Sequence, residues 1–277
     1  MTKQTGYCPV HNGEMYFEVE GNANAPAVIF IHACICDHSM WDAQMAAFTK
    51  HYRVLRFDQR GHGASRTQDT EYSGAQDLLD VMNHVGIGKA ALIGCSCGGE
   101  LALDMAVAHP ERAWAVVWVC GGLSGAPWPP PDLETWEEMK AVGILEALSE
   151  AKKMDELAEA ETHMWVNGLG QAKDRASSAI YQRVLKTIKA NQDRQDGKAK
   201  GLPINPTATE QLGALTKPVL LIIGALDVES THWSASIILK GMPGAQKVVF
   251  ENAAHLPSME HPQKFNDVVI EFLKTNR

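Results

Sequence analysis

The sequence predicts an α/β fold, in which a mostly parallel sheet is flanked by helices and a helical segment is inserted between two strands. Short continuous apolar runs alternate with longer stretches of helical periodicity, the order expected when parallel strands are joined by crossover helices. This alternation stops between about residues 124 and 212, where helical patterns follow one another without a buried strand.

The composition is that of a globular protein and argues against several functional classes. The chain has 277 residues, of which 45% are hydrophobic and 21% charged, and its formal net charge is −8. This acidic balance predicts no nucleic-acid partner. The longest apolar runs, such as residues 218–226, are too short to span a membrane. Residues 1–13 lack the apolar segment of a signal peptide, so the six cysteines predict a reduced, cytoplasmic protein rather than a disulfide framework.

The expected sheet begins with a hairpin and continues with buried strands. Residues 7–21 form the predicted hairpin, because Asn12 and Gly13 readily adopt the positive φ of a tight turn. The later strands are short apolar runs without alternation, as expected for strands that are covered on both faces. They are predicted at residues 27–32, 53–58, 90–94, 113–121, 218–224 and 246–251.

The expected helices lie between these strands and at the end of the chain. Each has apolar residues at helical spacing, and the segment 72–86 ends at a glycine suited to a C-cap. The predicted segments are residues 40–50, 72–86, 98–110 and 262–275.

The insertion between the fourth and fifth buried strands is predicted to be mostly helical. It opens with the proline-rich segment 126–132, continues with helical patterns at 133–151, 153–168 and 175–192, and ends in a loop over 196–207. We expect a helical cap at 124–212 between two parts of one core, residues 1–123 and 213–277. A packing appendage remains the alternative, but insertions after the strands of an α/β sheet lie at its ligand-binding edge.

The segment Gly94-Cys95-Ser96-Cys97-Gly98 matches the G-x-S-x-G pattern, and it follows a buried strand and precedes a helix. This is the context of a nucleophile elbow, where a tight turn exposes a serine and requires small neighbours. The alternative is a glycine-rich turn without a catalytic role. The position favours Ser96 as a nucleophile.

A serine nucleophile requires a base and an acid that orients the base. Asp227 follows the strand at 218–224, and His255 follows the strand at 246–251. The order serine, aspartate, histidine is the one that this architecture requires. Glu229 is a competing acid, and either residue could instead be an ordinary loop residue. The sequence therefore predicts a triad of Ser96, His255 and Asp227.

An oxyanion hole requires two backbone donors. The first candidate is the N–H of Cys97, which directly follows the nucleophile. The second is the N–H of Cys34, in the loop after the strand at 27–32.

With these motifs, the sequence resembles the α/β-hydrolase family in its cap-bearing branch. The resemblance lies in the segments 29–44, 53–65, 92–113, 217–227 and 251–273. It implies an α/β-hydrolase fold and catalysis by the triad without a metal or cofactor. It also implies that the polar segment with Asp58, Arg60 and His62 is a structural loop. His32 and His38 are likewise expected to be structural.

Within the family, the chain is most similar to 3-oxoadipate enol-lactonases, related esterases and cofactor-free perhydrolases. The segment 163–171 resembles part of the cap of that group, which implies that Trp165 borders the acyl pocket. One departure concerns the oxyanion loop, where His32-Ala33 replaces the usual His-Gly.

The thiols of Cys34, Cys36, Cys95 and Cys97 are expected at the same edge of the sheet. A soft-metal site is conceivable, but zinc-binding pairs usually have at least two residues between the cysteines. A disulfide, for instance between Cys34 and Cys97, would need Cα atoms within about 7 Å. The favoured interpretation is that these cysteines are small apolar residues, with Cys95 lining the substrate pocket.

The sequence thus predicts a serine hydrolase that cleaves a small-molecule carboxylic ester or lactone through an acyl-enzyme. The same triad could also serve a C–C bond hydrolase or a perhydrolase. A ligand-binding receptor that retains the triad is the alternative outside catalysis. We expect a small-molecule partner, without nucleic acid or membrane.

Overall fold

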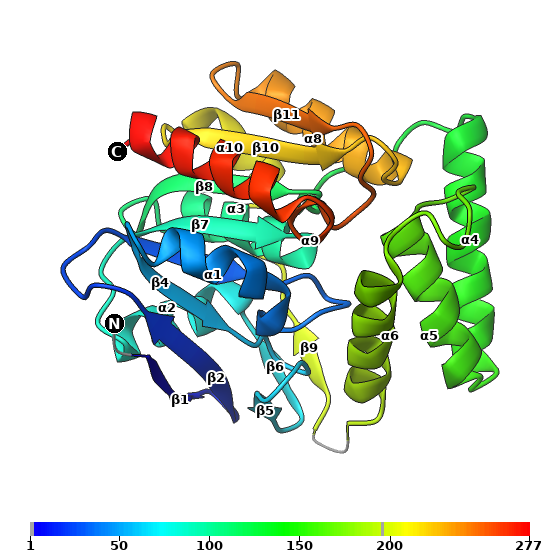
Figure 1. Cartoon of the computed structure of the whole chain (residues 1–277), viewed down its shortest axis with the longest axis horizontal. Helices are drawn as coiled ribbons and strands as arrows, with labels where there is room; N and C mark the ends of the chain where they lie inside the picture. The colour runs from blue at the N-terminus through cyan, green and yellow to red at the C-terminus, as the bar shows by residue number, and fades with distance from the viewer. Residues whose placement is uncertain (1–2, 195–196) are drawn as a thin grey trace.

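The computed structural model describes residues 3–194 and 197–277 and contains a twisted sheet covered by helices on both faces (Figure 1). The strand order in this sheet is β1-β2-β4-β3-β7-β8-β10-β11, with β5 paired to β2. The strands are β1 (Gln4–Val10), β2 (Gly13–Glu20), β3 (Ala27–Ile31), β4 (Arg53–Phe57), β5 (Arg66–Thr67), β7 (Ala90–Cys95), β8 (Ala113–Val119), β10 (Val219–Gly224) and β11 (Gln246–Phe250).

The predicted strands are confirmed, as is the predicted hairpin of β1 and β2. Asn12 takes φ 50° in the hairpin turn, as the sequence suggested. From β4 to β11 neighbouring strands pair in parallel, whereas β2 pairs antiparallel with both β1 and β4. Every residue of β3, β7 and β10 is buried, which explains why these strands read as continuous apolar runs.

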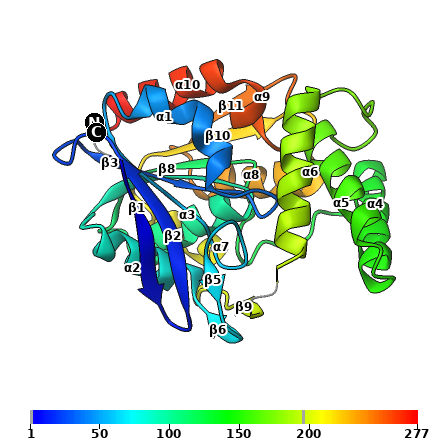
Figure 2. The ribbon, with the colours of Figure 1, turned by 60° about the horizontal axis from the view of Figure 1, so that its bottom comes forward.

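Two apolar clusters pack on opposite faces of the sheet. Alternate residues of β3 divide between them: Ile29 and Ile31 belong to one cluster, Val28 and Phe30 to the other. The helices α2 (Gly74–His84), α3 (Cys97–Ala108) and α8 (Glu229–Gly241) cover the first face, and α1 (Asp42–Phe48) and α10 (Pro262–Thr275) cover the second (Figures 1 and 2). Short helices complete the core: η1 (His38–Trp41), α7 (Ala208–Gln211), η3 (Leu212–Ala214) and α9 (Pro257–Glu260).

The chain between β8 and β10 forms a helical layer beside the carboxyl ends of the parallel strands (Figure 1). It contains α4 (Leu133–Glu150), α5 (Met154–Thr162), the π-helix η2 (His163–Asn167) and α6 (Ser178–Gln192). Figure 2 shows the same helices standing apart from the sheet at one end of the molecule. Within the described part of the chain, we find no helix with the length and apolar character needed to cross a bilayer.

Some elements differ from the expectation. The predicted loop at 196–207 contains a short strand, β9 (Ala199–Gly201), which pairs in parallel with β6 (Thr70–Tyr72). Every residue of these two strands is exposed or only partly buried, so no apolar pattern marks them in the sequence. The helix α8 had no counterpart among the predicted segments. Residues 1–2 of the expected first core segment and 195–196 of the expected cap lie outside the described residues.

Candidate active site

Ser96 lies in the sharp turn between β7 and α3. Its backbone takes φ 58° and ψ −124°, a conformation that residues with side chains rarely adopt. Two glycines permit this turn: a Cβ at Gly94 would lie 1.9 Å from the carbonyl oxygen of Gly98, and a Cβ at Gly98 would lie 2.4 Å from that of Ile31. The turn thus has the backbone strain and close packing of a nucleophile elbow.

Backbone hydrogen bonds fix the Ser96 turn to the end of β8. The N–H of Ser96 donates to Val119 O at 3.0 Å, and Ser96 O accepts from the N–H of Gly122 at 3.2 Å. Ser96 O also accepts from the N–H of Gly99 at 2.9 Å, within the first turn of α3. The strained conformation is therefore held from both sides.

Asp227 and His255 follow β10 and β11, and their side chains meet. Nδ1 of His255 lies 2.9 Å from each carboxylate oxygen of Asp227, and both side chains are buried. Asp227 also accepts a hydrogen bond from the N–H of Val228 at 2.9 Å. Because the carboxylate accepts the proton on Nδ1, Nε2 is left as the acceptor. Glu229, the competing acid, is the first residue of α8.

Ser96 and His255 line the same cavity, which has a volume of about 290 Å³. Trp128 and Trp165 from the helical insertion and residues at the start of α8 complete its walls. Among the described residues, the Ser96 hydroxyl makes no hydrogen bond to His255. In ligand-free enzymes such a bond is often long and tightens only with substrate. The structure therefore brings Ser96, His255 and Asp227 together, although the Ser96 hydroxyl and His255 are not hydrogen-bonded to each other.

Trp165 packs directly on the imidazole of His255. The two ring centroids lie 4.4 Å apart, and the backbone N–H of His255 donates to the backbone oxygen of Trp165 at 3.2 Å. Trp165 belongs to the π-helix η2, an irregularity that often occurs at functional sites. The structure thus places Trp165 on the wall of the cavity that Ser96 and His255 line, and its contact with an acyl group stays a prediction.

Arg175 fastens η2 to the loop that carries His255. Its guanidinium donates to the carbonyl oxygens of Val166 and Asn167 on one side and of Asn252 on the other. It also forms an ion pair with Glu260 at 2.6 Å. Sequence reasoning missed Arg175, because a side chain that binds backbone carbonyls leaves no motif.

The proposed oxyanion donors Cys34 and Cys97 are joined by a disulfide, with Cα atoms 5.9 Å apart. Cys97 is the first residue of α3, so its N–H has no acceptor within the helix. Cys34 lies in a turn after β3, and its N–H donates to no residue within 3–194 and 197–277. Neither N–H group therefore has an acceptor among the described residues.

Polar residues around the oxyanion loop hold its backbone. Nε2 of His62 lies 2.8 Å from Cys34 O, and Nε2 of Gln59 donates to His32 O at 2.7 Å. Nδ1 of His32 lies 2.8 Å from Ala33 O, and its Nε2 accepts from the N–H of Gln59 at 2.8 Å. Burial lowers the pKa of His32 to about 4, so the ring is neutral and can accept at Nε2. These contacts agree with the structural role expected for this segment.

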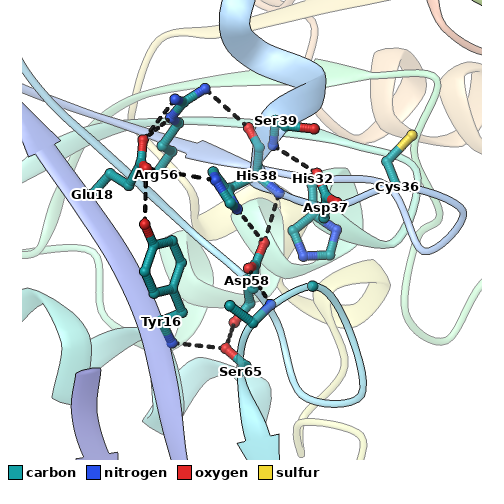
Figure 3. Close-up of polar contacts among 12 residues, drawn as sticks. Tyr16, Glu18, His32, Cys36, Asp37, His38, Ser39, Arg56, Asp58 and Ser65 are labelled. Carbon is teal, nitrogen blue, oxygen red and sulfur yellow. Dashed lines mark hydrogen bonds and ion pairs between the residues drawn. The ribbon is translucent and has the colours of Figure 1, made fainter. Parts of the chain in front are cut away.

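A second histidine–aspartate pair lies beneath this loop (Figure 3). The Asp58 carboxylate is fully buried and accepts from the N–H and Nδ1 of His38, each at 2.7 Å, and from the N–H of Ala64 at 2.8 Å. Nearby, Glu18 accepts two hydrogen bonds from Arg56 at 2.9 and 2.6 Å. The network joins η1, β2 and the loop after β4, which is a structural arrangement.

The four cysteines form two Cys-x-Cys motifs, Cys34-Ile35-Cys36 and Cys95-Ser96-Cys97. One cysteine from each motif belongs to an outer pair, Cys34 and Cys97, and the other to an inner pair, Cys36 and Cys95. The expectation that all are small apolar residues is wrong for the outer pair, which is a disulfide. The inner pair is free and buried, and burial raises the pKa of both thiols. Cys95 is fully buried, with its sulfur 3.5 Å from His255 O. The predicted pocket role of Cys95 does not match this placement, because β7 directs it into the core.

The ligand-atom geometry does not support the soft-metal alternative. Within the described part of the chain, two groups could hold an ion: Cys120 with Asp227 and His255, and Asp37 with His38 and Asp58. Neither includes the four cysteines of the two motifs. In the first group Asp227 and His255 already bind each other, and in the second His38 and Asp58 do so.

A family model described as the alpha/beta hydrolase fold matches residues 26–262. The chain belongs to the α/β-hydrolase family. It is 27% identical to 3-oxoadipate enol-lactonase 1 of Acinetobacter baylyi over 263 residues, which cover 93% of this chain and 92% of the relative. It is 30% identical to a 2-hydroxy-6-oxononadienedioate/2-hydroxy-6-oxononatrienedioate hydrolase of a Pseudomonas species, with coverage of 95% and 92%. The solved structure of carboxylesterase CesB from Bacillus subtilis has a TM-score of 0.77 at 21% identity and covers 99% of this chain and 92% of its own. The predicted fold class and family are confirmed.

Proposed function

We propose that this α/β-hydrolase is a serine hydrolase that cleaves a carboxylic ester or lactone of a small molecule through an acyl-enzyme. One observation carries the proposal: Ser96, on a strained turn, shares a small cavity with His255, whose other ring nitrogen is held by Asp227 at 2.9 Å. The names of the relatives, which include an enol-lactonase and a carboxylesterase, agree with this reaction class.

In the proposed reaction, Nε2 of His255 removes the proton of the Ser96 hydroxyl as its oxygen attacks the carbonyl carbon. Asp227 holds the imidazole in the required tautomer and stabilises the imidazolium. The N–H groups of Cys34 and Cys97 donate to the oxyanion of the tetrahedral intermediate. His255 then protonates the leaving alcohol and activates the water that hydrolyses the acyl-enzyme.

A panel of p-nitrophenyl esters of graded acyl length, run beside a panel of lactones, tests this function. We expect turnover of short acyl chains, because the cavity is only about 290 Å³. Absence of hydrolysis across both panels would contradict the proposal.

Hydrolysis of a C–C bond next to a carbonyl is a second candidate. It is favoured by the 30% identity to the Pseudomonas hydrolase named above. Cleavage of a vinylogous 1,5-diketone at a higher kcat/KM than any ester or lactone would favour this candidate. Ligand binding without turnover and without reaction with a fluorophosphonate would instead favour the receptor alternative.

We also propose that residues 124–212 act as a cap over the site, between core segments 1–123 and 213–277. Trp128 and Trp165 from this segment line the Ser96 cavity. Glu138 of α4 accepts from the N–H of Ser230 at 2.9 Å and so attaches the cap to the start of α8. We place the protein in the cytoplasm, acting on a small molecule that enters beneath the cap.

A further inference from the structure

A disulfide joins the two residues whose backbone N–H groups form the proposed oxyanion hole. Cys34 belongs to the loop after β3 and Cys97 opens α3, with a sequence separation of 63 residues. Their Cα atoms lie 5.9 Å apart. Because the bond links the two donors, the position of each donor depends on the other.

A cavity distinct from the Ser96 cavity reaches this bond. Cys34 and Cys97 both line a cavity of about 350 Å³, together with Gln59 and Glu100. Cys97 and Glu100 also line the Ser96 cavity, so the two spaces adjoin at these residues. Cys34 is exposed and Cys97 is half-buried. A small reagent can therefore reach the sulfur atoms without occupying the space in front of Ser96.

The charges of this second cavity favour an uncharged reagent. Asp77, Glu100 and Asp104 contribute carboxyl groups to its lining. The lining also contains Arg60, but this guanidinium is ion-paired with Asp77 at 2.6 Å. The ion pair also neutralises Asp77, which leaves the carboxyl groups of Glu100 and Asp104. They repel a thiol that carries a carboxylate of its own more than a thiol whose only charge is that of the attacking thiolate.

The other thiols of the chain do not compete for this chemistry. All four are free and buried. Burial raises the pKa of each, that of Cys8 to about 11, so little thiolate forms near neutral pH. Exchange between thiol and disulfide is thereby confined to Cys34 and Cys97.

We propose that the Cys34–Cys97 disulfide is a redox site that holds the oxyanion hole in its active geometry, and that reduction by a small uncharged thiol lowers turnover. This inference rests on the proposed hydrolase function. A disulfide in the cytoplasm, where we place the protein, is usually transient and redox-sensing rather than structural.

The chemistry is a two-electron exchange with a dithiol. One thiolate of the reductant attacks the exposed sulfur of Cys34, which breaks the bond to Cys97 and releases that sulfur as a thiolate. The positive end of the α3 dipole stabilises this leaving group. The second thiol of the reductant then displaces Cys34 and closes the oxidised reductant as a cyclic disulfide. The protons of the reductant's two thiols balance those gained by the two cysteines.

Reduction is expected to loosen the oxyanion loop rather than to unfold it. The bonds from His62 to Cys34 O and from Gln59 to His32 O do not involve the disulfide sulfurs, so we expect them to remain after reduction. Removal of one oxyanion donor costs about 100- to 1000-fold in kcat. A displaced donor should cost less, so we expect kcat to fall by roughly 10- to 100-fold with little change in KM.

The test compares the oxidised and reduced forms of the full chain. One sample is oxidised with diamide and the other is reduced with dithiothreitol. Each is then freed of reagent without air, and kcat and KM for p-nitrophenyl acetate are measured. Part of each sample is alkylated with iodoacetamide under native conditions, and the adducts are counted and located by mass spectrometry. We expect adducts on Cys34 and Cys97 only after reduction, a lower kcat in the reduced form, and recovery of kcat on reoxidation.

Two substitutions provide matched controls. Cys34→Ser should have the lower kcat of the reduced form under both conditions. Cys8→Ala, on β1, should have the kcat and the redox response of the original chain. The comparison of the two redox forms needs no substitution, so misfolding of Cys34→Ser would not prevent the test.

Three outcomes would overturn the inference. Alkylation of both cysteines after diamide treatment would show that no disulfide forms. Equal kcat in the two forms, with the expected adducts, would show that the bond does not control turnover. No hydrolysis in either form, with the expected adducts, would contradict the proposed function and the coupling together, while the adduct count would still establish the disulfide.

Discussion

The part of the chain that the structure describes contains two histidine–aspartate pairs of similar geometry in different surroundings. Nδ1 of His255 lies 2.9 Å from Asp227, and Nδ1 of His38 lies 2.7 Å from Asp58. The second ring nitrogen distinguishes them. Nε2 of His38 lies 3.7 Å from the Glu18 carboxylate (Figure 3). The His255 side chain instead lines the cavity of the proposed active site.

Each pair also has a serine nearby, and the two serines differ in the same way. Ser65 is fully buried; its hydroxyl donates to Asp58 O at 2.5 Å and accepts from the N–H of Tyr16 at 2.8 Å. Ser96 lies on the strained turn and lines a cavity. The distance between histidine and aspartate therefore does not identify a catalytic pair. What distinguishes the proposed catalytic pair is that Nε2 of His255 and the Ser96 hydroxyl have no hydrogen-bond partner among the described residues, and that both residues line one cavity.

The largest expected effect separates the two serines. Ser96→Ala should lower kcat on the order of a million-fold, because the nucleophile is lost. Ser65→Ala, the matched control, should leave kcat within about ten-fold, because the described partners of the Ser65 hydroxyl are backbone groups of Tyr16 and Asp58. Steady-state kinetics on the best ester measures both. Similar losses in the two variants would contradict the contrast.

Substitutions of the two aspartates should affect different quantities, kcat for Asp227 and the free energy of unfolding for Asp58. Asp227→Asn should lower kcat by about ten thousand-fold, since an amide does not hold the correct imidazole tautomer. Asp58→Asn should instead lower the free energy of unfolding by about 3 kcal/mol, because it breaks a buried charged pair. Its kcat should change by less than about ten-fold. Urea unfolding and kinetics on both variants test this, and the reverse pattern would exchange the roles of the two pairs.

The His38 pair should contribute to stability in a pH-dependent way. Burial alone would lower the pKa of His38, but the Asp58 carboxylate outweighs it and raises this pKa in the folded state. The resulting stabilisation is fully present below the unfolded pKa of about 6.5 and is lost as the pH rises through the folded pKa. His38→Gln should therefore cost about 2 kcal/mol near pH 6 and less at pH 9. A cost that grows with pH in urea titrations would contradict this.

The smallest effect concerns the aromatic cover on His255. Trp165→Ala should lower kcat/KM by roughly ten-fold, because it removes the ring that packs on the imidazole. Trp136→Ala provides a control, since that tryptophan is 52% exposed on α4. Equal effects of the two substitutions on kcat/KM would indicate that Trp165 has no special role at the site.

The sequence predicted the fold and the candidate triad because their signals are local. Buried parallel strands read as apolar runs, and the glycines around Ser96 are required by backbone contacts within the same turn and with the end of β3. Asp227 and His255 could be placed because each directly follows a recognisable strand.

What the sequence did not predict depends on tertiary distances. The pairing of Cys34 with Cys97 rests on a Cα separation that only the folded chain has. The π-helix around Trp165 differs from an α-helix only in its hydrogen bonding, and Arg175 acts on carbonyl groups far away in the sequence. The sequence favours Cys95 as a pocket residue because it adjoins Ser96, but Cys95 is the last residue of β7 and packs in the apolar cluster on one face of the sheet.

Covalent labelling with a fluorophosphonate tests the central claim most directly. The reagent is incubated with the original chain and with Ser96→Ala. Mass spectrometry of the intact chain counts the adducts, and peptide masses locate them. We expect one adduct per chain, on Ser96, and none in the variant. No adduct on the original chain, or an adduct on another residue that persists in Ser96→Ala, would contradict it.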